Sequence, residues 1–133
     1  MKTKVSTISI LLLASMVLWS FEQAKPWVVP EKYVTMTNPV NSDDESLKNG
    51  KALWGKHCQS CHGKTGMGDG TKAAELDSEI GDMTTADSQK QSDGSLFYKT
   101  LEGRDDMPSF KKKIPDENDM WSIVNYIRTL NAK

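Results

Sequence analysis

The sequence lacks several features that define other classes of protein. Its 133 residues carry a formal net charge of −1, and Lys111–Lys113 is the longest basic run, so the charge pattern does not indicate a nucleic-acid partner. No stretch shows sustained alternation of polar and apolar residues, which argues against β-strands and predicts an all-α fold. Cysteine occurs only twice, at Cys58 and Cys61, so no N-terminal cysteine is present to carry a lipid anchor.

The N-terminal segment contains the longest apolar run. Two lysines precede Ile8–Trp19, which is apolar apart from two serines, and this pattern is typical of an export signal. The run is short for a full membrane span. The first arginine is Arg104, which argues against an arginine-rich mitochondrial presequence. Residues 1–24 are therefore predicted to be a signal peptide or an uncleaved membrane anchor, with residues 5–20 as the tether, and the protein is predicted to be periplasmic.

Proline content and helical spacing divide the rest of the chain into an arm and a small domain. Residues 25–45 carry three prolines and are predicted to form an extended arm that either packs on the domain or acts as a tether. Residues 46–133 are predicted to be the domain, in which Gly50 is either tolerated within the first helix or marks the close approach of another backbone. The predicted helices cover about 43–58, 93–103 and 116–130, and residues 71–92 are polar and irregular. A domain this small is marginal on apolar burial alone, so we expect another group to complete its centre.

The stretch KHCQSCHG (56–63) contains a Cys-x-x-Cys-His motif formed by Cys58, Cys61 and His62. A zinc site would need four ligands from this one stretch, an iron–sulfur cluster normally takes four cysteines, and a thioredoxin-like dithiol needs a βαβ pattern. The motif is instead the attachment signature of c-type haem. Two cysteines three residues apart at a helix end lie on one side, where both thiols can bond one porphyrin. We therefore predict one covalent haem c held by Cys58 and Cys61, with His62 as an iron ligand.

The second axial ligand of the iron is expected to be a methionine. Four methionines follow the motif: Met67, Met83, Met107 and Met120. Met120 lies on the apolar stripe of the last helix, so its expected place is the core, and Met107 precedes Pro108 in a loop between two predicted helices. Loops positioned by a scaffold commonly carry ligands. We predict Met107 as the second ligand, and we predict that His57 is a surface residue.

Three stretches of the domain resemble the class I, single-haem cytochromes c of bacteria. They are GKALWGKHCQSCHG (50–63), GRDDMPSF (103–110) and WSIVNYIRTL (121–130). The resemblance implies a small cytochrome c fold, in which helices wrap around one covalently bound haem and the N- and C-terminal helices cross. It also implies that Gly50 and Trp54 of the first helix meet Tyr126 of the last.

The function expected from these features is electron transport. With both axial positions filled, no substrate reaches the iron, so we expect single-electron transfer between redox protein partners and no enzymatic activity. One alternative is a haem c subunit fixed in a membrane respiratory complex, which an uncleaved N-terminal helix would favour. A second alternative is a gas sensor or a peroxide-reactive protein, if Met107 can be displaced from the iron.

Overall fold

The computed structural model describes residues 26–131, so the predicted signal or anchor at 1–24 and the tether at 5–20 lie outside the described residues. The elements in chain order are α2 (Glu31–Val34), α3 (Asp44–His57), α4 (Gln59–His62), the 3₁₀ turn η2 (Ala73–Glu75), α5 (Ala86–Gln89), α6 (Asp93–Glu102) and α7 (Glu117–Arg128). Over the described residues no strand forms, and the only β-type pairing is an isolated bridge between Arg104 and Met107. The prediction of an all-α fold is confirmed.

Side chains at the helix starts explain why the three longest helices begin where they do. The carboxylate of Asp43 accepts a hydrogen bond from the Ser46 amide at α3, and the Ser92 hydroxyl accepts one from the Ser95 amide at α6. The Asp116 carboxylate accepts from the Asn118 amide at α7. Each cap satisfies one of the amides that have no partner within their own helix.

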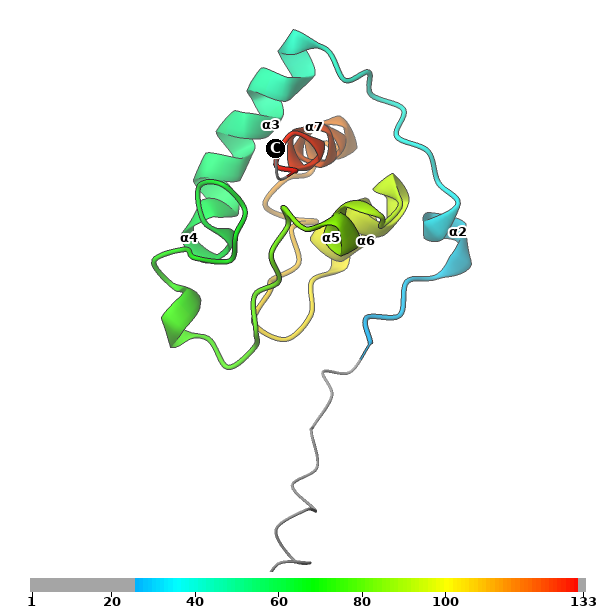
Figure 1. Cartoon of the computed structure of the whole chain (residues 1–133). Helices are drawn as coiled ribbons and strands as arrows, with labels where there is room; N and C mark the ends of the chain where they lie inside the picture. The colour runs from blue at the N-terminus through cyan, green and yellow to red at the C-terminus, as the bar shows by residue number, and fades with distance from the viewer. Residues whose placement is uncertain (1–25, 132–133) are drawn as a thin grey trace, which may run out of the picture.

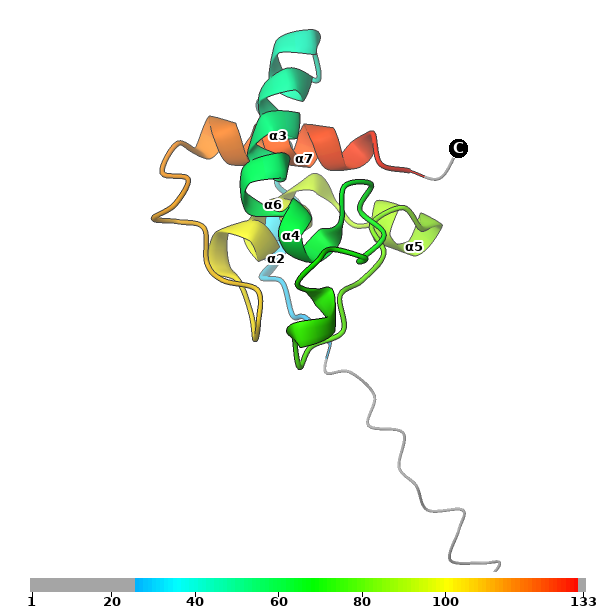
Figure 2. The same cartoon turned by 90° about the vertical axis from the view of Figure 1, so that its left-hand side faces the viewer.

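Helices α3 and α7 cross at close range, as Figures 1 and 2 show. Gly50 lies at the crossing, because a Cβ built there would overlap the Ser122 carbonyl oxygen of α7 and lie 2.9 Å from the Cβ of Tyr126. The ring centroids of Trp54 and Tyr126 are 5.9 Å apart. The predicted meeting of the first and last helices is therefore confirmed, and Gly50 marks the close approach of a backbone.

The core lies where α6 packs against α7. The rings of Phe97 and Trp121 stack with centroids 4.1 Å apart and an interplanar angle of 12°. Met120 is 1% exposed and belongs to the core, as its position on the apolar stripe predicted. The other large buried side chains of this cluster include Trp54, Leu96, Leu101, Phe110, Ile114, Ile123, Val124 and Ile127.

The described part of the arm, residues 26–45, packs on the domain. Tyr33 of α2 lies 4.7 Å from Tyr98 and 6.5 Å from Phe97, measured between ring centroids. The amide of Asn38 donates to Asn125 Oδ1 over 2.8 Å and to the Trp121 carbonyl over 3.3 Å. Figure 1 shows this segment passing beside α6 before the chain enters α3. Of the two arrangements that the sequence left open, the structure contains the packed one.

Candidate cofactor site

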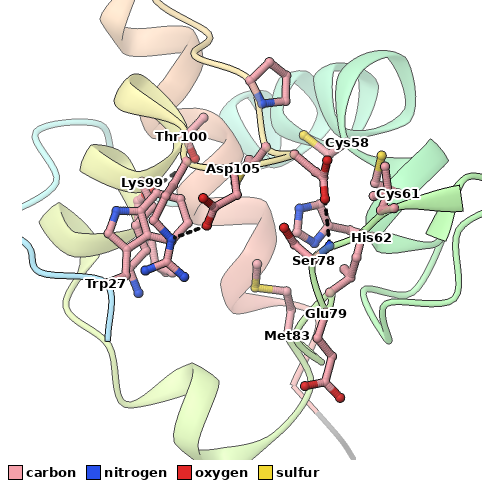
Figure 3. Close-up of a pocket in the computed structure, with 18 of the residues that line it drawn as sticks. Trp27, Cys58, Cys61, His62, Ser78, Glu79, Met83, Lys99, Thr100 and Asp105 are labelled. Carbon is pink, nitrogen blue, oxygen red and sulfur yellow. Dashed lines mark hydrogen bonds and ion pairs between the residues drawn. The ribbon is translucent and has the colours of Figure 1, made fainter. Parts of the chain in front are cut away.

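One cavity brings the motif and the predicted ligand loop together. It measures about 330 Å³, within the usual range for pockets that bind small molecules, and we call it the cofactor pocket. Cys58, Cys61 and His62 border it on one side, and Trp27 and Lys99 border it on the other (Figure 3). Its further lining includes the apolar side chains Leu76, Ile80, Leu96, Phe110 and Ile127. The pocket therefore combines an apolar wall with a few polar and sulfur-bearing groups.

The motif lies at the junction of two helices. Cys58 is both the last cap of α3 and the first cap of α4, and its carbonyl accepts the His62 amide over 2.9 Å. The indole of Trp54 donates to the Gly63 carbonyl over 3.0 Å, which holds the end of the motif against α3. Cys58 is buried, Cys61 is half-buried, and no disulfide joins them. Both thiols are thus available, and burial, with a smaller effect from Cys61, raises the pKa of the Cys58 thiol to about 12.

His62 has the properties of a ligand whose partner is another group. Burial lowers the pKa of its imidazole, which favours the neutral ring that binds metals. Its Nδ1 atom is buried and has no hydrogen-bond partner within residues 26–131. A buried polar atom without a partner costs free energy, so its presence beside a cavity fits a ring that interacts with a bound group. The ring of Trp54 packs against the imidazole of His62, with the two ring centroids 5.7 Å apart.

The loop that carries Met107 is tightly held. The amide of Arg104 donates to the Met107 carbonyl over 2.8 Å, and the Met107 amide donates back over 2.9 Å. Gly103 begins the loop with a positive φ of 69°, and a Cβ there would overlap the Met107 carbonyl oxygen. Asp105, at the tip, also has a positive φ of 52°. This narrow turn places Met107 and Pro108 at the pocket.

The four methionines after the motif have different environments. Met107 and Met83 both line the pocket, whereas Met67 is 56% exposed and Met120 is in the core. Met83 is positioned by two backbone hydrogen bonds, from its own amide to the Gly66 carbonyl and from the Gln89 side chain to its carbonyl. Its sequence context is polar and gives no signal of this position. Two thioethers therefore border the cavity, and Met107 is the one followed by proline.

Several other lining residues have no motif in the sequence. Trp27 comes from the arm, Lys99 from α6 and Arg104 from the loop before Met107. His57, predicted to be a surface residue, is half-buried and lines the pocket, with its ring centroid 6.0 Å from that of Phe110. Burial lowers the pKa of His57, and the charges of Lys56 and Lys113 lower it further.

The residues present fit a covalently bound haem. Two thiols that are not cross-linked, an imidazole with an unpaired buried nitrogen and a thioether all border one largely apolar cavity. Thiols, imidazole and thioether are the protein groups that attach haem c or bind its iron. All four of these side chains line the same pocket.

Comparisons with known proteins agree with this fit. The family model described as cytochrome C oxidase, cbb3-type, subunit III matches residues 45–127. No curated protein matches the chain. A solved structure described as the Kuenenia stuttgartiensis reducing HAO-like protein complex Kustc0457/Kustc0458 is similar in fold, with a TM-score of 0.64, 24% identity and 84% of this chain covered. This chain spans 54% of the length of that one, about half.

A second solved structure is described as KustC0563 c-type cytochrome. It has a TM-score of 0.55 and 26% identity, and the match covers 62% of this chain and 98% of that one. Among residues 26–131, no helix combines the length and the apolar character needed to cross a bilayer.

Proposed function

The chain belongs to the family described as cytochrome C oxidase, cbb3-type, subunit III, and from this membership we propose that it is an exported c-type cytochrome that carries single electrons through a haem ligated by His62 and Met107. The family match covers most of the domain, and the second similar structure is itself described as a c-type cytochrome. Haem-based electron transfer follows from the family. The ligand set, the redox partners and the compartment are the proposed part.

The observation that carries the proposal is that the motif and the Met107 loop line one cavity. His62 is held by α4 and by Trp54, and Met107 is held by the two backbone hydrogen bonds of its turn. His62 and Met107, which separate elements bring to one cavity, would be the residues that hold the iron of a bound haem.

A bound haem c supplies an iron that alternates between the ferrous and ferric states. Methionine ligation raises the reduction potential relative to ligation by two histidines. The apolar residues that line the pocket, such as Leu96, Phe110 and Ile127, would limit the access of water to a bound haem. With His62 and Met107 both bound to the iron, no position is left for a substrate, so we propose a carrier rather than an enzyme. Redox protein partners would exchange electrons at the surface beside the pocket.

The proposed organisation assigns a role to each segment. Residues 1–24 are a signal peptide or membrane anchor, residues 25–45 are an arm, and residues 46–133 are the cytochrome c domain. Export to the periplasm agrees with the apolar N-terminal run and with the attachment of haem c outside the cytoplasm. The mass of the mature protein distinguishes a cleaved signal from a retained anchor with residues 5–20 in the membrane.

The second candidate function is a haem c subunit fixed in a membrane respiratory complex. The matching family takes its name from a subunit of an oxidase, and one similar structure is part of a protein complex. In that case the same haem relays electrons within an assembly. Purification of the native protein distinguishes the candidates, because a mobile carrier elutes alone and a fixed subunit elutes with other chains.

The ligand set is tested with methionine variants of the protein matured with haem. Met107→Ala should retain covalent haem and open the sixth coordination position, so that the ferrous protein binds carbon monoxide. The weak long-wavelength absorption of the iron–sulfur bond in the ferric state should disappear with it. Asp105 and Asp106 of the same turn also line the pocket, so the loss of the iron–sulfur absorption is the direct sign that the thioether was the ligand.

Met83→Ala and Met67→Ala are the matched controls. Met83 also lines the pocket and Met67 is exposed, so both variants remove a thioether without removing the proposed ligand. Both should stay closed to carbon monoxide. If Met83→Ala opens the iron and Met107→Ala does not, the assignment of the ligand is wrong. If the wild-type ferrous protein already binds carbon monoxide readily, the gas-sensing alternative gains support.

A further inference from the structure

The arm packs on the domain at Gly94, where there is no room for a side chain. A Cβ built on Gly94, at the start of α6, would overlap the Tyr33 carbonyl oxygen and lie 2.9 Å from the Cβ of Met36. Gly94 is also buried, so the backbone of the arm lies directly on the helix. Together with the bonds of Asn38 to α7, this contact fixes the path of residues 33–38.

Upstream of this attachment, the arm leads to the cofactor pocket. Trp27 lines the cavity although it lies 31 positions before Cys58 in the sequence. The guanidinium of Arg104 lies 4.7 Å from the centroid of the Trp27 ring, and the ammonium of Lys99 lies 5.4 Å from it. Figure 3 shows Trp27 beside Lys99, across the pocket from Cys58 and His62. Cation–π contacts of this kind hold an aromatic ring in place.

The surroundings of Trp27 are partly shielded from water. Lys99 is half-buried, and burial together with the charge of Arg104 lowers the pKa of its ammonium. Lys99 also bonds to Gln91, and Arg104 pairs with Asp105 over 3.1 Å. The Trp27 ring, which the arm supplies, therefore packs on Lys99 and on Arg104, whose charge is paired with Asp105.

We propose that the arm is a strap that completes the haem pocket, and that Trp27 is a positioning residue which shields this side of the haem and raises its reduction potential. The inference rests on the proposed function, because it needs a haem in the pocket. It concerns a part of the chain that precedes the family match, which begins at residue 45.

One physical effect sets the sign of the change in potential. The ferric haem carries one more positive charge than the ferrous haem, so exclusion of water disfavours the ferric state and raises the potential. The charged side chains do not set the sign, because Arg104 pairs with Asp105, and Glu79 and Asp106 line the same pocket. Removal of the Trp27 ring admits water and should therefore lower the potential.

The experiment is a redox titration of the haem-loaded protein, followed by its visible spectrum, in the wild type and four variants. Trp27→Ala removes the ring, and its potential should fall below that of the wild type. Val28→Ala is the matched control, because Val28 is the next residue of the arm and is 79% exposed, and its potential should be unchanged. Gly94→Ala displaces the arm without touching the pocket, so it should reproduce the fall in potential seen in Trp27→Ala. Faster proteolysis within the arm should accompany it.

The outcomes separate the strap from the function on which it rests. If Trp27→Ala keeps its haem and its ferric iron–sulfur absorption but titrates at the wild-type potential, the strap is refuted and the electron carrier stands. A wild-type potential in Gly94→Ala, with its arm open to protease, overturns the strap equally. If the wild-type protein matures without haem, both proposals fail. Trp27→Phe, which keeps an aromatic ring, should restore most of the potential lost in Trp27→Ala.

Discussion

Gly50 offers the sharpest test of how the domain is held together. We expect Gly50→Ala to destabilise the protein, although alanine is the better helix former. The added methyl group would overlap the Ser122 carbonyl oxygen and lie 2.7 Å from the Ser122 carbonyl carbon. These are backbone atoms of α7, which cannot rotate away as a flexible side chain would. The crossing of α3 and α7 must therefore open.

The size of the effect follows from two opposing contributions. Replacing glycine by alanine within a helix stabilises it by about 1 kcal/mol. Overpacking a tight contact costs typically about 1–3 kcal/mol, and a backbone obstacle places Gly50 at the upper end of that range. The net loss in the free energy of unfolding should be about 2 kcal/mol. For a domain of this size such a loss lowers the melting temperature by roughly 8–16 °C.

Gly55→Ala is a control in the same helix. Gly55 is exposed, and the nearest atom to a Cβ built there is Gln59 Oε1 at 3.9 Å, which is ordinary contact. The helix preference then acts alone, so this variant should be stabilised by about 0.5–1 kcal/mol. Thermal and denaturant unfolding of the haem-loaded proteins, followed by circular dichroism, measures both changes. Because both variants replace glycine by alanine in α3, opposite changes in the free energy of unfolding would isolate the effect of the contact with α7.

The reasoning would be refuted if the two variants changed stability in the same direction. A stabilised Gly50→Ala would mean that α7 yields to the added methyl group without cost, and that the two helices are not locked at this point. A strongly destabilised Gly55→Ala would mean that the start of the haem motif, rather than the crossing, is sensitive to substitution.

Two further predictions concern the arm and the haem attachment. Asn125→Ala should lower the free energy of unfolding by about 1–3 kcal/mol in a denaturant titration, because the carbonyls of Val40 and Asn41 lose their donor. A wild-type unfolding midpoint would show that water replaces the amide. Cys58→Ser combined with Cys61→Ser should abolish covalent haem, detected by the mass of the protein, and should remove cooperative unfolding. A compact, cooperative protein without haem would contradict the idea that the core depends on it.

The helices could be predicted from the sequence because local signals define them, whereas their crossing was expected only from the resemblance to the class I cytochromes c. Apolar residues at helical spacing specify α3, α6 and α7 to within a few residues, and Gly103 marks the end of α6. The motif predicted the side chains of α4 that face the cavity, because cysteines three residues apart at a helix end share one side. The polar segment was harder to predict, and α5 (Ala86–Gln89) has no apolar periodicity that would indicate a helix.

The rest of the pocket could not be predicted because its residues meet only through the tertiary fold. Met83 and Trp27 have no neighbouring motif, and nothing in the spacing of either indicates the cavity. The packing of the arm on the domain depends on Gly94 and Asn125. Each of them is 50 or more positions along the chain from the arm residues that it contacts. A contact between segments so far apart in the sequence can be identified only from the tertiary structure.

The proposed ligands are coupled to the helix crossing by the order of the elements. Helix α3 ends directly at Cys58, so the position of the motif follows the position of α3. Helix α6 is fixed on α7 by the stacking of Phe97 on Trp121 and ends at the turn that carries Met107. The distance between His62 and Met107 is therefore set by how α3 and α6 each rest on α7. The tight crossing at Gly50 thus sets the position of the motif relative to the Met107 turn, even though Gly50 itself does not line the cavity.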